Sequence, residues 1–319
     1  MRTLLTEHIA YADDPSSIIA HAVNLSRQSK RFAFVTSIGF EGGAARALGS
    51  LAVVDEVGIM TGYLSNGCID KDIQLHAIES LQSNTKKLIR YGDGSQFADL
   101  TLPCGGSLSV LIDPNRDRTE LSLLHQSLLA RKAGKLTFSL PHLDGQLPDT
   151  VCFEYKPKAR LVLAGRGAIF RAMAQISHAT GFEVFCLSPN VDDLTAVESL
   201  TEVPPVHLKS PGQSPSLNLL DANAAFLTLF HDHDWELALL QKALITNAHY
   251  IGCLGSKRTH IIRLDRLRGL GVAEDDIRRL RGPVGLVPSL RDAPLIAISA
   301  LAEIASTLPL RVRRCWPTQ

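Results

Sequence analysis

A glycine turn between a predicted strand and a predicted helix is the first feature of this sequence that suggests a binding site. The apolar residues 160–164 lead into Gly165-Arg166-Gly167, and an amphipathic helix is predicted over 167–180. In a dinucleotide-binding βαβ unit, the first glycine forms a tight turn and the second lets the backbone approach a phosphate. The phosphate then binds the free N–H groups of the helix. Gly165 and Gly167 are therefore candidate contacts to an anionic cofactor.

Two parts of the dinucleotide fingerprint are absent from this turn. Phe170 stands where the third glycine belongs. Ser188 ends the next predicted strand, where an acidic residue would bind a ribose hydroxyl. The order of strand, turn and helix still predicts a Rossmann-like unit, but the residues argue against a tight NAD(P) site.

A second polar loop, His231-Asp232, follows a strand predicted over 224–229. Ligands of an open α/β sheet bind outside the carboxyl ends of its strands, so this loop is expected to meet the glycine turn. His231, Asp232 and the neighbouring His233 lie too close together to form a metal site by themselves. We therefore treat His231 and Asp232 as candidate cofactor contacts in a polar loop.

A third loop, Gly255-Ser256-Lys257-Arg258, follows the strand predicted over 248–252 and opens a helix. Its helix N-terminus and its two cations would favour an anionic ligand, and it is expected to converge with the other two loops. The loop is not a P-loop, because that motif has four residues between its glycines. Arginines further along the helix are expected to form a solvated face: Arg263, Arg266 and Arg268.

Two cysteines lie beside glycines in the N-terminal half. Cys68 lies near the N-terminus of a helix predicted over 67–82, whose dipole favours a thiolate. Cys104 is followed by Gly105-Gly106, which leave the sulfur unshielded and the backbone amides free to form an anion nest. Because thiolates are soft metal ligands and carriers of sulfur, Cys68 and Cys104 are candidate contacts to a metal or to transferred sulfur.

The remaining cysteines give no sign of a metal or disulfide framework. The chain has 6 cysteines without a CxxC pair or zinc-finger spacing, so free thiols are expected. Cys152, Cys186 and Cys253 lie in or beside apolar strands and are predicted to be core residues.

The composition is that of a globular chain of about two domains. It has 319 residues, 45% of them hydrophobic, and a formal net charge of +1. That charge gives no reason to expect a nucleic acid or a membrane surface as partner. No apolar run is long enough to span a bilayer and no secretory leader pattern is present, so we expect a cytoplasmic protein.

The order of predicted elements indicates an α/β fold with two domains. A small N-terminal α/β domain is predicted over 1–137, and a stretch with three prolines and one glycine over 138–158 is interpreted as a linker. From 159 to 319, strands alternate with helices. This alternation predicts a Rossmann-like, doubly wound parallel sheet.

Taken together, the motifs resemble the xanthine dehydrogenase accessory (XdhC/CoxI) family over nearly the whole chain. One departure is Ala45, which replaces the proline of a Pro-Arg-x-x-Gly segment, and another is Ser188 at the strand end. The matching segments are Arg46-Ala47-Leu48-Gly49, Asn66-Gly67-Cys68-Ile69-Asp70, Cys104-Gly105-Gly106, His231-Asp232, residues 250–259, residues 282–286 and Glu303.

The resemblance implies a maturation chaperone rather than an enzyme. Such a protein would bind molybdenum cofactor, as molybdopterin or its cytosine dinucleotide form, while a cysteine desulfurase supplies the terminal sulfido ligand. It would then insert the cofactor into a xanthine dehydrogenase or aldehyde oxidoreductase-type molybdenum hydroxylase. The family also suggests a cofactor nucleotidyltransferase as a partner and a homodimer as the oligomeric state. Arg46, Cys68, Cys104 and the three C-terminal loops would hold the cofactor, with the two cysteines near molybdenum or sulfur.

Two other functions stay open from the sequence. The C-terminal unit is also compatible with an NAD(P)-dependent oxidoreductase, although its fingerprint is incomplete. The chain is equally compatible with a stabiliser of the apoenzyme that binds protein and no cofactor. Titration with NADPH and with released molybdopterin distinguishes these alternatives.

Overall fold

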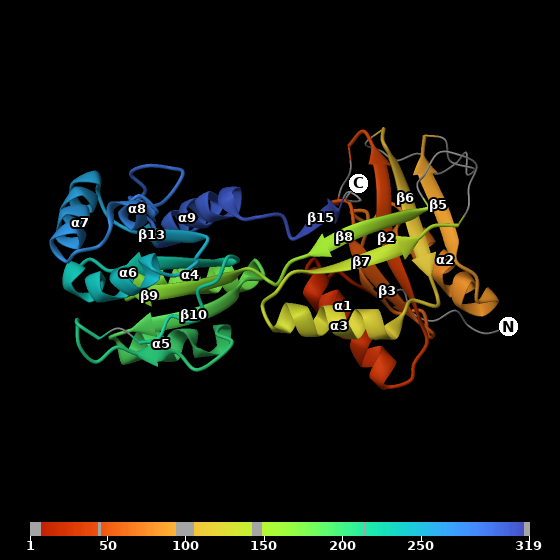
Figure 1. Ribbon diagram of the computed structural model, residues 1–319, viewed down its shortest axis with the longest axis horizontal. Helices are drawn as coiled ribbons and strands as arrows, with labels where there is room; N and C mark the ends of the chain where they lie inside the picture. The colour runs from red at the N-terminus through yellow and green to blue at the C-terminus, as the bar shows by residue number, and fades with distance from the viewer. Residues whose placement is uncertain (1–7, 44–45, 94–104, 142–148, 214, 316–319) are drawn as a thin grey trace. The chain divides into compact units, whose positions relative to one another are not determined.

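The computed structural model describes residues 8–43, 46–93, 105–141, 149–213 and 215–315. The chain forms two compact units, which are coloured along the sequence in Figure 1. One unit comprises Met1–Pro157 together with Leu310–Gln319, and the other comprises Lys158–Pro309.

The first unit is built on a mixed six-stranded sheet of order β1-β4-β3-β2-β6-β5. Its strands are β1 (Ile9–Ala10), β2 (Phe32–Glu41), β3 (Leu51–Asp55), β4 (Met60–Gly62), β5 (Lys87–Gly92) and β6 (Ser107–Asp113). Its helices are α1 (Pro15–Arg27), α2 (Asp70–Ser83) and α3 (Arg118–Leu129).

Both faces of this sheet are covered, which explains why its central strands read as unbroken apolar runs. Along β2, Phe32 and Phe34 enter a core shared with α1 and α3. The alternate residues Ala33 and Val35 enter a second core shared with α2. Successive side chains of a strand point to opposite faces, so a strand buried on both sides has no polar alternation.

A second, three-stranded sheet of order β15-β8-β7 also belongs to the first unit. It comprises β7 (Gly134–Ser139), β8 (Thr150–Tyr155) and β15 (Val312–Cys315). The predicted linker over 138–158 therefore contains β8 and the end of β7, and the C-terminal strand leaves the predicted 159–319 domain. The division of the chain thus differs from the predicted boundaries.

Alternation of buried and partly exposed residues along β8 is the sequence signal that could have revealed this sheet. Val151, Phe153 and Tyr155 are buried, whereas Cys152 and Glu154 between them are partly exposed. Such a period of two is that of a strand with one covered face. The flanking prolines obscured it, because they suggest irregular structure. The pairing of β15 with β8 joins segments 159 residues apart, a contact that no local pattern reveals.

The second unit contains a six-stranded sheet of order β11-β10-β9-β12-β13-β14, and all of its strand pairs are parallel. Its strands are β9 (Arg160–Gly165), β10 (Glu183–Ser188), β11 (Val206–His207), β12 (Ala224–Leu229), β13 (Tyr250–Cys253) and β14 (Leu280–Arg281). Its α-helices are α4 (Ala168–Ala179), α5 (Val191–Val197), α6 (Leu237–Leu244), α7 (Lys257–Gly269), α8 (Glu274–Ile277) and α9 (Ala293–Thr307).

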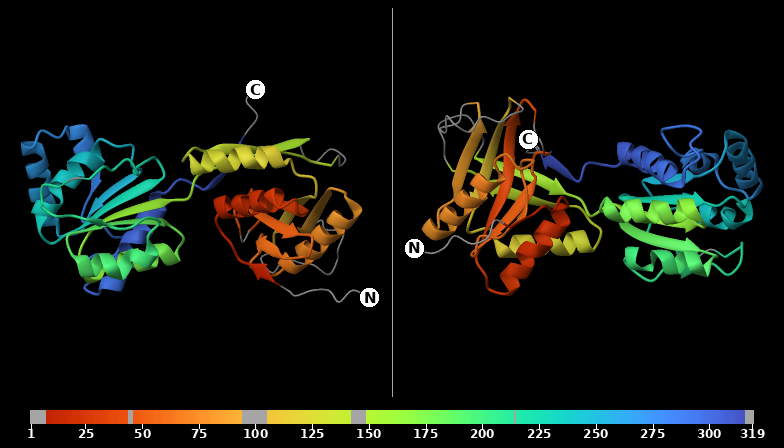
Figure 2. Two further views of the ribbon diagram at one scale, coloured as in Figure 1. Left: turned by 90° about the horizontal axis from the view of Figure 1, so that it is seen from below. Right: turned by 180° about the vertical axis from the view of Figure 1, so that it is seen from behind.

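Helices cover both faces of this parallel sheet, as Figure 2 shows. The helices α4, α5 and α9 share one core with the sheet, and α6, α7 and α8 share the other. The predicted doubly wound Rossmann-like fold is therefore confirmed. Phe170, at the position of the third fingerprint glycine, is fully buried in the core under α4. The residue there supplies packing volume, whereas a glycine would allow close helix–strand contact.

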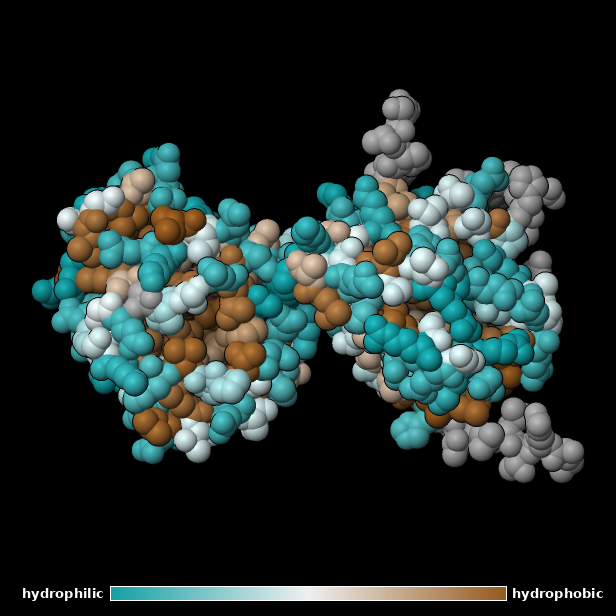
Figure 3. Space-filling model, turned by 60° about the horizontal axis from the view of Figure 1, so that its bottom comes forward, coloured by the Kyte–Doolittle hydropathy of each residue, from teal (hydrophilic) through white to brown (hydrophobic). Residues whose placement is uncertain are grey.

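Apolar side chains also reach the surface of both units among polar ones (Figure 3). In the second unit they include Leu286, Val287, Leu295 and Ile298. Within the described residues, no helix is both long and apolar enough to cross a membrane.

The prediction that three cysteines are core residues is confirmed for Cys186 and Cys253 and is wrong for Cys152. Cys186 and Cys253 are buried, and burial raises the pKa of each thiol to about 12. Cys152 is only partly buried and lies directly opposite Cys315 in the pairing of β8 with β15. Burial and the neighbouring Cys152 raise the pKa of Cys315 to about 11.

We expect Cys152 and Cys315 to form a disulfide on treatment with diamide. Opposite residues of an antiparallel pair have Cβ atoms roughly 4.5–5.5 Å apart, and a disulfide needs about 3.5–4.5 Å, so a small shift suffices. Diamide accepts the two hydrogens of the thiols, and the protein loses two alkylatable thiols. Peptide mapping by mass spectrometry should identify the linked pair, and Cys315→Ser should abolish it. Recovery of both cysteines in alkylated form would contradict this prediction.

Candidate functional site

Several of the predicted N-terminal site residues lie at one edge of the mixed sheet. The strands β1, β2, β4 and β5 end at this edge, and β3 and β6 begin there. Arg46 lies between β2 and β3, Cys68 between β4 and α2, and Gly105 and Gly106 directly before β6. The fold thus brings together segments that are distant in sequence. Cys104 lies outside the described residues.

The Cys68 turn is fixed by the fully buried carboxylate of Asp70. Asp70 Oδ1 accepts hydrogen bonds from the N–H groups of Leu64 (2.8 Å) and Ser65 (2.9 Å). Its Oδ2 accepts from Ser65 Oγ (2.8 Å) and from the N–H of Gly67 (2.9 Å). Cys68 itself is exposed. Cys68 thus lies close to the start of α2, as the sequence predicts, and the turn holds its thiol accessible to solvent.

Arg46 is engaged by its own unit. Its guanidinium forms an ion pair with Asp13 and lies 4.2 Å from the ring centroid of Tyr63. The Tyr63 hydroxyl donates to Asp13 (2.7 Å), and the ring of Tyr11 packs edge-on against Tyr63 at 5.2 Å. Burial lowers the pKa of Arg46. An anionic cofactor would have to compete with Asp13 for this guanidinium.

Gly106 allows three chain segments to approach one another. A Cβ added there would lie 2.6 Å from the carbonyl oxygen of Glu41 and 2.7 Å from that of Gly43. A Cβ on Gly92 would lie 2.1 Å from the carbonyl oxygen of Gly106. These contacts give Gly106 a packing role within the fold. Gly105 has φ +67°, which favours glycine, and open space around its Cβ position.

The second unit has a pocket of about 770 Å³ at the carboxyl edge of its parallel sheet. It lies at the N-termini of α4 and α9. Its wall combines basic, acidic and apolar side chains, so it suits a ligand with an anionic group and an apolar or flat body. The lining residues are Arg166, Gly167, Ala168, Ile169, Arg171, Asn190, Asp193, Leu229, His231, Leu290, Arg291, Ala293 and Ile296.

Only part of the predicted convergence occurs in this pocket. Gly167 and His231 line it together, as predicted for the first two loops. Gly165 is buried at the end of β9, where an added Cβ would lie 2.6 Å from Leu229 Cβ. The pocket lining includes neither Asp232 nor any residue of the third loop. The predicted convergence is thus seen in this pocket for the first two loops, and the third loop is not part of its lining.

Two of the predicted cofactor-binding residues, Ser256 and Asp232, accept hydrogen bonds from backbone N–H groups of their own loops. Ser256 caps α7, because its Oγ accepts from the N–H of Thr259 (3.1 Å). Asp232 accepts from the N–H of Asp234 (3.1 Å) and caps the short 3-10 helix His233–Trp235. Lys257 and Arg258 are exposed in the first turn of α7, as predicted. Gly255 has φ +139° at the turn before the helix.

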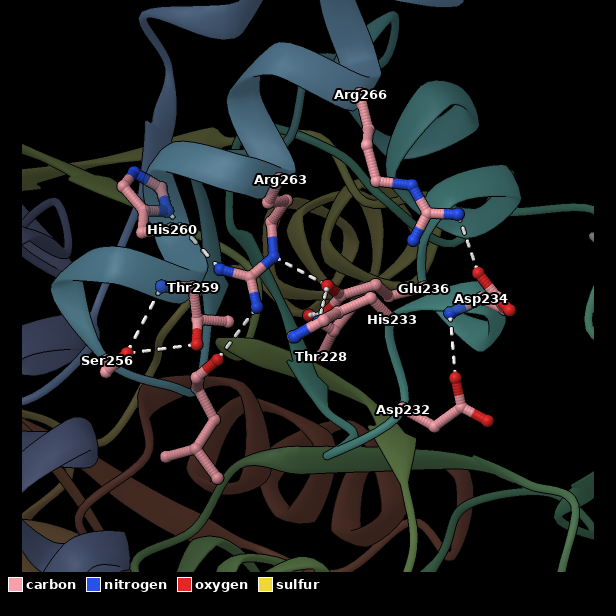
Figure 4. Close-up of polar contacts among 11 residues, drawn as sticks. Thr228, Asp232, His233, Asp234, Glu236, Ser256, Thr259, His260, Arg263 and Arg266 are labelled. Atoms are coloured by element: carbon pink, nitrogen blue, oxygen red, sulfur yellow. Dashed lines mark hydrogen bonds and ion pairs between the residues drawn. The ribbon is translucent and has the colours of Figure 1, made fainter.

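Glu236, which the sequence did not single out, lies at the centre of a buried ionic network in the second unit (Figure 4). Arg263 Nε donates to Glu236 Oε1 (2.7 Å), and both side chains are inaccessible to solvent. His233 Nδ1 lies 2.7 Å from the same oxygen, and the Thr228 hydroxyl donates to Glu236 Oε2 (3.0 Å). The prediction of a solvated Arg263 is therefore wrong, whereas Arg266 and Arg268 are partly exposed as expected.

The network continues from Arg263 into the loops around α7. Its Nη2 donates to the carbonyl oxygen of Leu254 (2.9 Å), and its Nη1 lies 3.3 Å from His260 Nδ1. Burial, followed by the charge of Arg263, lowers the pKa of His260. The Arg263 guanidinium thus contacts Leu254, directly before the third loop, and His260, on the helix that follows it.

Glu303, one of the family-like positions, also has a structural role. Its Oε1 accepts from the hydroxyl of Tyr250 (2.7 Å), and its Oε2 accepts from the N–H of Gly285 (2.5 Å). These bonds join α9 to β13 and to the loop before α9. Burial and the hydrogen bond to Glu303 raise the pKa of Tyr250 far above its usual value.

Comparison with known proteins places this architecture in one family. Residues 161–304 match the model of the XdhC Rossmann domain, and residues 25–92 match that of the XdhC and CoxI family. The chain is 32% identical to the molybdenum cofactor insertion chaperone PaoD of Escherichia coli, over 94% of this chain and 91% of the relative. It is 24% identical to a protein of Bacillus subtilis named as a probable xanthine dehydrogenase subunit, over 85% of this chain and 92% of that protein.

A solved structure has the same fold. The crystal structure titled as a xanthine dehydrogenase from Bacillus halodurans superposes with a TM-score of 0.73 at 22% identity, covering 91% of this chain and 95% of that one. With both family models matched in chain order and a relative above 30% identity over nearly its full length, this chain belongs to the XdhC and CoxI family.

Proposed function

We propose that this protein is an insertion chaperone for molybdenum cofactor. It holds the cofactor while the terminal sulfido ligand is installed, and then delivers it to a molybdenum hydroxylase of the xanthine dehydrogenase or aldehyde oxidoreductase type. The observation that carries the proposal is the exposed Cys68 thiol in a turn fixed by Asp70. The similarity to the Escherichia coli insertion chaperone supports the class of cargo.

The chemistry of the Cys68 turn suits this cargo. A thiolate is a soft ligand and binds soft metals or accepts sulfur, whereas a buried thiol does neither. Four hydrogen bonds to Asp70 restrict the turn, so the sulfur needs little reorganisation to make a contact. Cys104 is proposed as a second contact, because it directly precedes Gly105 and Gly106 in the sequence.

The pocket of the second unit suits the organic part of the cofactor. Its apolar wall includes Leu229 and Ile296 and could pack against a flat heterocycle. Arg166, Arg291 and His231 could bind a terminal phosphate or a cytidine diphosphate. Lys257 and Arg258 are proposed as additional, more distant cations. The sites of the two units are proposed independently of each other.

The proposed partners follow from the same role. The client apoenzyme receives the cofactor, and a cysteine desulfurase supplies sulfur. A cofactor nucleotidyltransferase would act earlier if the dinucleotide form is the cargo. A homodimer in the cytoplasm is the proposed working state.

We expect Cys68→Ser to weaken retention of molybdenum cofactor at least about tenfold, equivalent to about 1.4 kcal/mol. Cofactor released from a hydroxylase is mixed with the protein, and molybdenum and pterin are quantified after gel filtration. The activity of a reconstituted client gives a second readout. Cys104→Ala tests the second thiol, and Cys315→Ser, on β15, is the matched control.

The same experiment separates the alternatives. Retention by wild type and by Cys315→Ser, with loss in Cys68→Ser, supports the cofactor role of the turn. Wild-type protein that binds the client and retains no cofactor would contradict the proposal and favour a protein-binding stabiliser. Comparison of Arg291→Ala with Arg258→Ala measures whether the pocket or the start of α7 holds the anionic group.

A further inference from the structure

A carboxylate of the protein itself already occupies the glycine turn that opens α4. Asp193 Oδ2 accepts the N–H of Gly167 (2.7 Å), and Asp193 Oδ1 accepts from Arg171 Nε (2.5 Å). Asp193 is only 2% exposed and forms part of the pocket wall. In a dinucleotide-binding unit this N–H group, at the positive end of the helix dipole, faces the phosphate.

The local structure of α5 presents Asp193 to this turn. Asn190 is the N-cap of α5, and its side chain accepts the N–H of Asp193 (3.1 Å). Asp193 is therefore the third residue of the helix, where an acidic side chain often bonds back to its own N-cap. Here it reaches Gly167, 26 residues earlier in the chain.

A bound diphosphate at Gly167 would meet two obstacles. It would bring negative charge against a buried carboxylate, and it would compete for an N–H group and a guanidinium that Asp193 already uses. Displacement of Asp193 would leave a buried charge without its partners, which is unfavourable. The pocket lining also contains Arg166, Arg291 and His231, and all three side chains are exposed.

We propose that Asp193 is a specificity-determining residue that excludes dinucleotides of the NAD(P) type from the glycine turn. Asp193 takes the place of the ligand phosphate, and Arg171 balances its charge. Anionic groups that enter the pocket bind instead to the side chains of Arg166 and Arg291, and not to the N–H of Gly167. The inference deepens the proposed function, because it states which nucleotide chemistry the pocket rejects.

The test measures binding of ADP, NADPH and inorganic pyrophosphate by isothermal titration calorimetry. We expect each ligand to bind Asp193→Ala at least tenfold more tightly than wild type, because the substitution frees the N–H of Gly167 and the guanidinium of Arg171. Asp192→Ala is the matched control, because Asp192 is the exposed neighbour on the same helix. It should behave as wild type.

Two results would overturn the inference. One is NADPH binding to wild type as tightly as to Asp193→Ala, and the other is a folded Asp193→Ala variant with no gain. If this variant does not fold, an NMR titration of the wild type decides: pyrophosphate should give no scalar coupling through a hydrogen bond between the Gly167 amide and phosphorus, and such a coupling would refute the inference. None of these ligands contains molybdenum, so the outcome is independent of the cofactor retention test.

Discussion

Replacement of Arg263 by alanine is expected to lower the free energy of unfolding of the second unit by about 3–5 kcal/mol, because it leaves the buried Glu236 carboxylate without its cation. The pair is inaccessible to solvent, and Arg263 also binds the carbonyl oxygen of Leu254. Chemical denaturation followed by tryptophan fluorescence measures the change, since Trp235 directly precedes Glu236.

Arg266→Ala is the control for this prediction. Arg266 lies on the same helix and pairs with Asp234 at 2.6 Å, but both side chains are largely exposed. An exposed ion pair contributes about 0–1 kcal/mol, so the control should change stability little. Equal effects of the two substitutions would show that burial of Arg263 does not determine its contribution.

Replacement of Asp70 by alanine is expected to destabilise the first unit by about 3 kcal/mol. The substitution removes an acceptor that serves three backbone N–H groups and one hydroxyl, and hydrogen bonds to a charged group contribute about 1.5–3 kcal/mol each before water replaces part of them. Urea denaturation gives the stability change. Hydrogen exchange of the amides of Leu64, Ser65 and Gly67 should accelerate in parallel.

Asp117→Ala provides a matched comparison in the same unit. Asp117 is the N-cap of α3 and accepts from the N–H groups of Thr119 (2.8 Å) and Glu120 (3.3 Å) at the surface. Loss of such a cap costs about 1 kcal/mol. If Asp70→Ala costs no more than this, the Cys68 turn is not held by its buried carboxylate, and the argument for a preorganised thiol fails.

The arginines of α7 show which side-chain environments could be predicted from the sequence. The solvated positions of Arg266 and Arg268 follow from the local pattern of charge along the helix. Arg263 carries the same charge on the same helix. Its burial depends on Glu236, 27 residues away, and a helix pattern does not specify which polar residue has a buried partner.

The sequence by itself determined the elements with local causes. Apolar runs separated by periodic helices predicted the parallel sheet of the second unit, and Gly165 and Gly167 predicted the turn before α4. The position of Cys68 close to the start of α2 followed from the helical period of the residues after it. These features depend on backbone conformation and on contacts within a few residues, which composition and spacing encode directly.

Only the tertiary structure decided which side chain meets which turn. Asp193 reaches the N–H of Gly167, the third loop stays outside the pocket lining, and β15 returns to pair with β8 in the first unit. Each of these contacts joins segments that are distant along the chain. They depend on the packing of whole layers against one another, and a buried polar group takes whichever partner that packing places within hydrogen-bond distance.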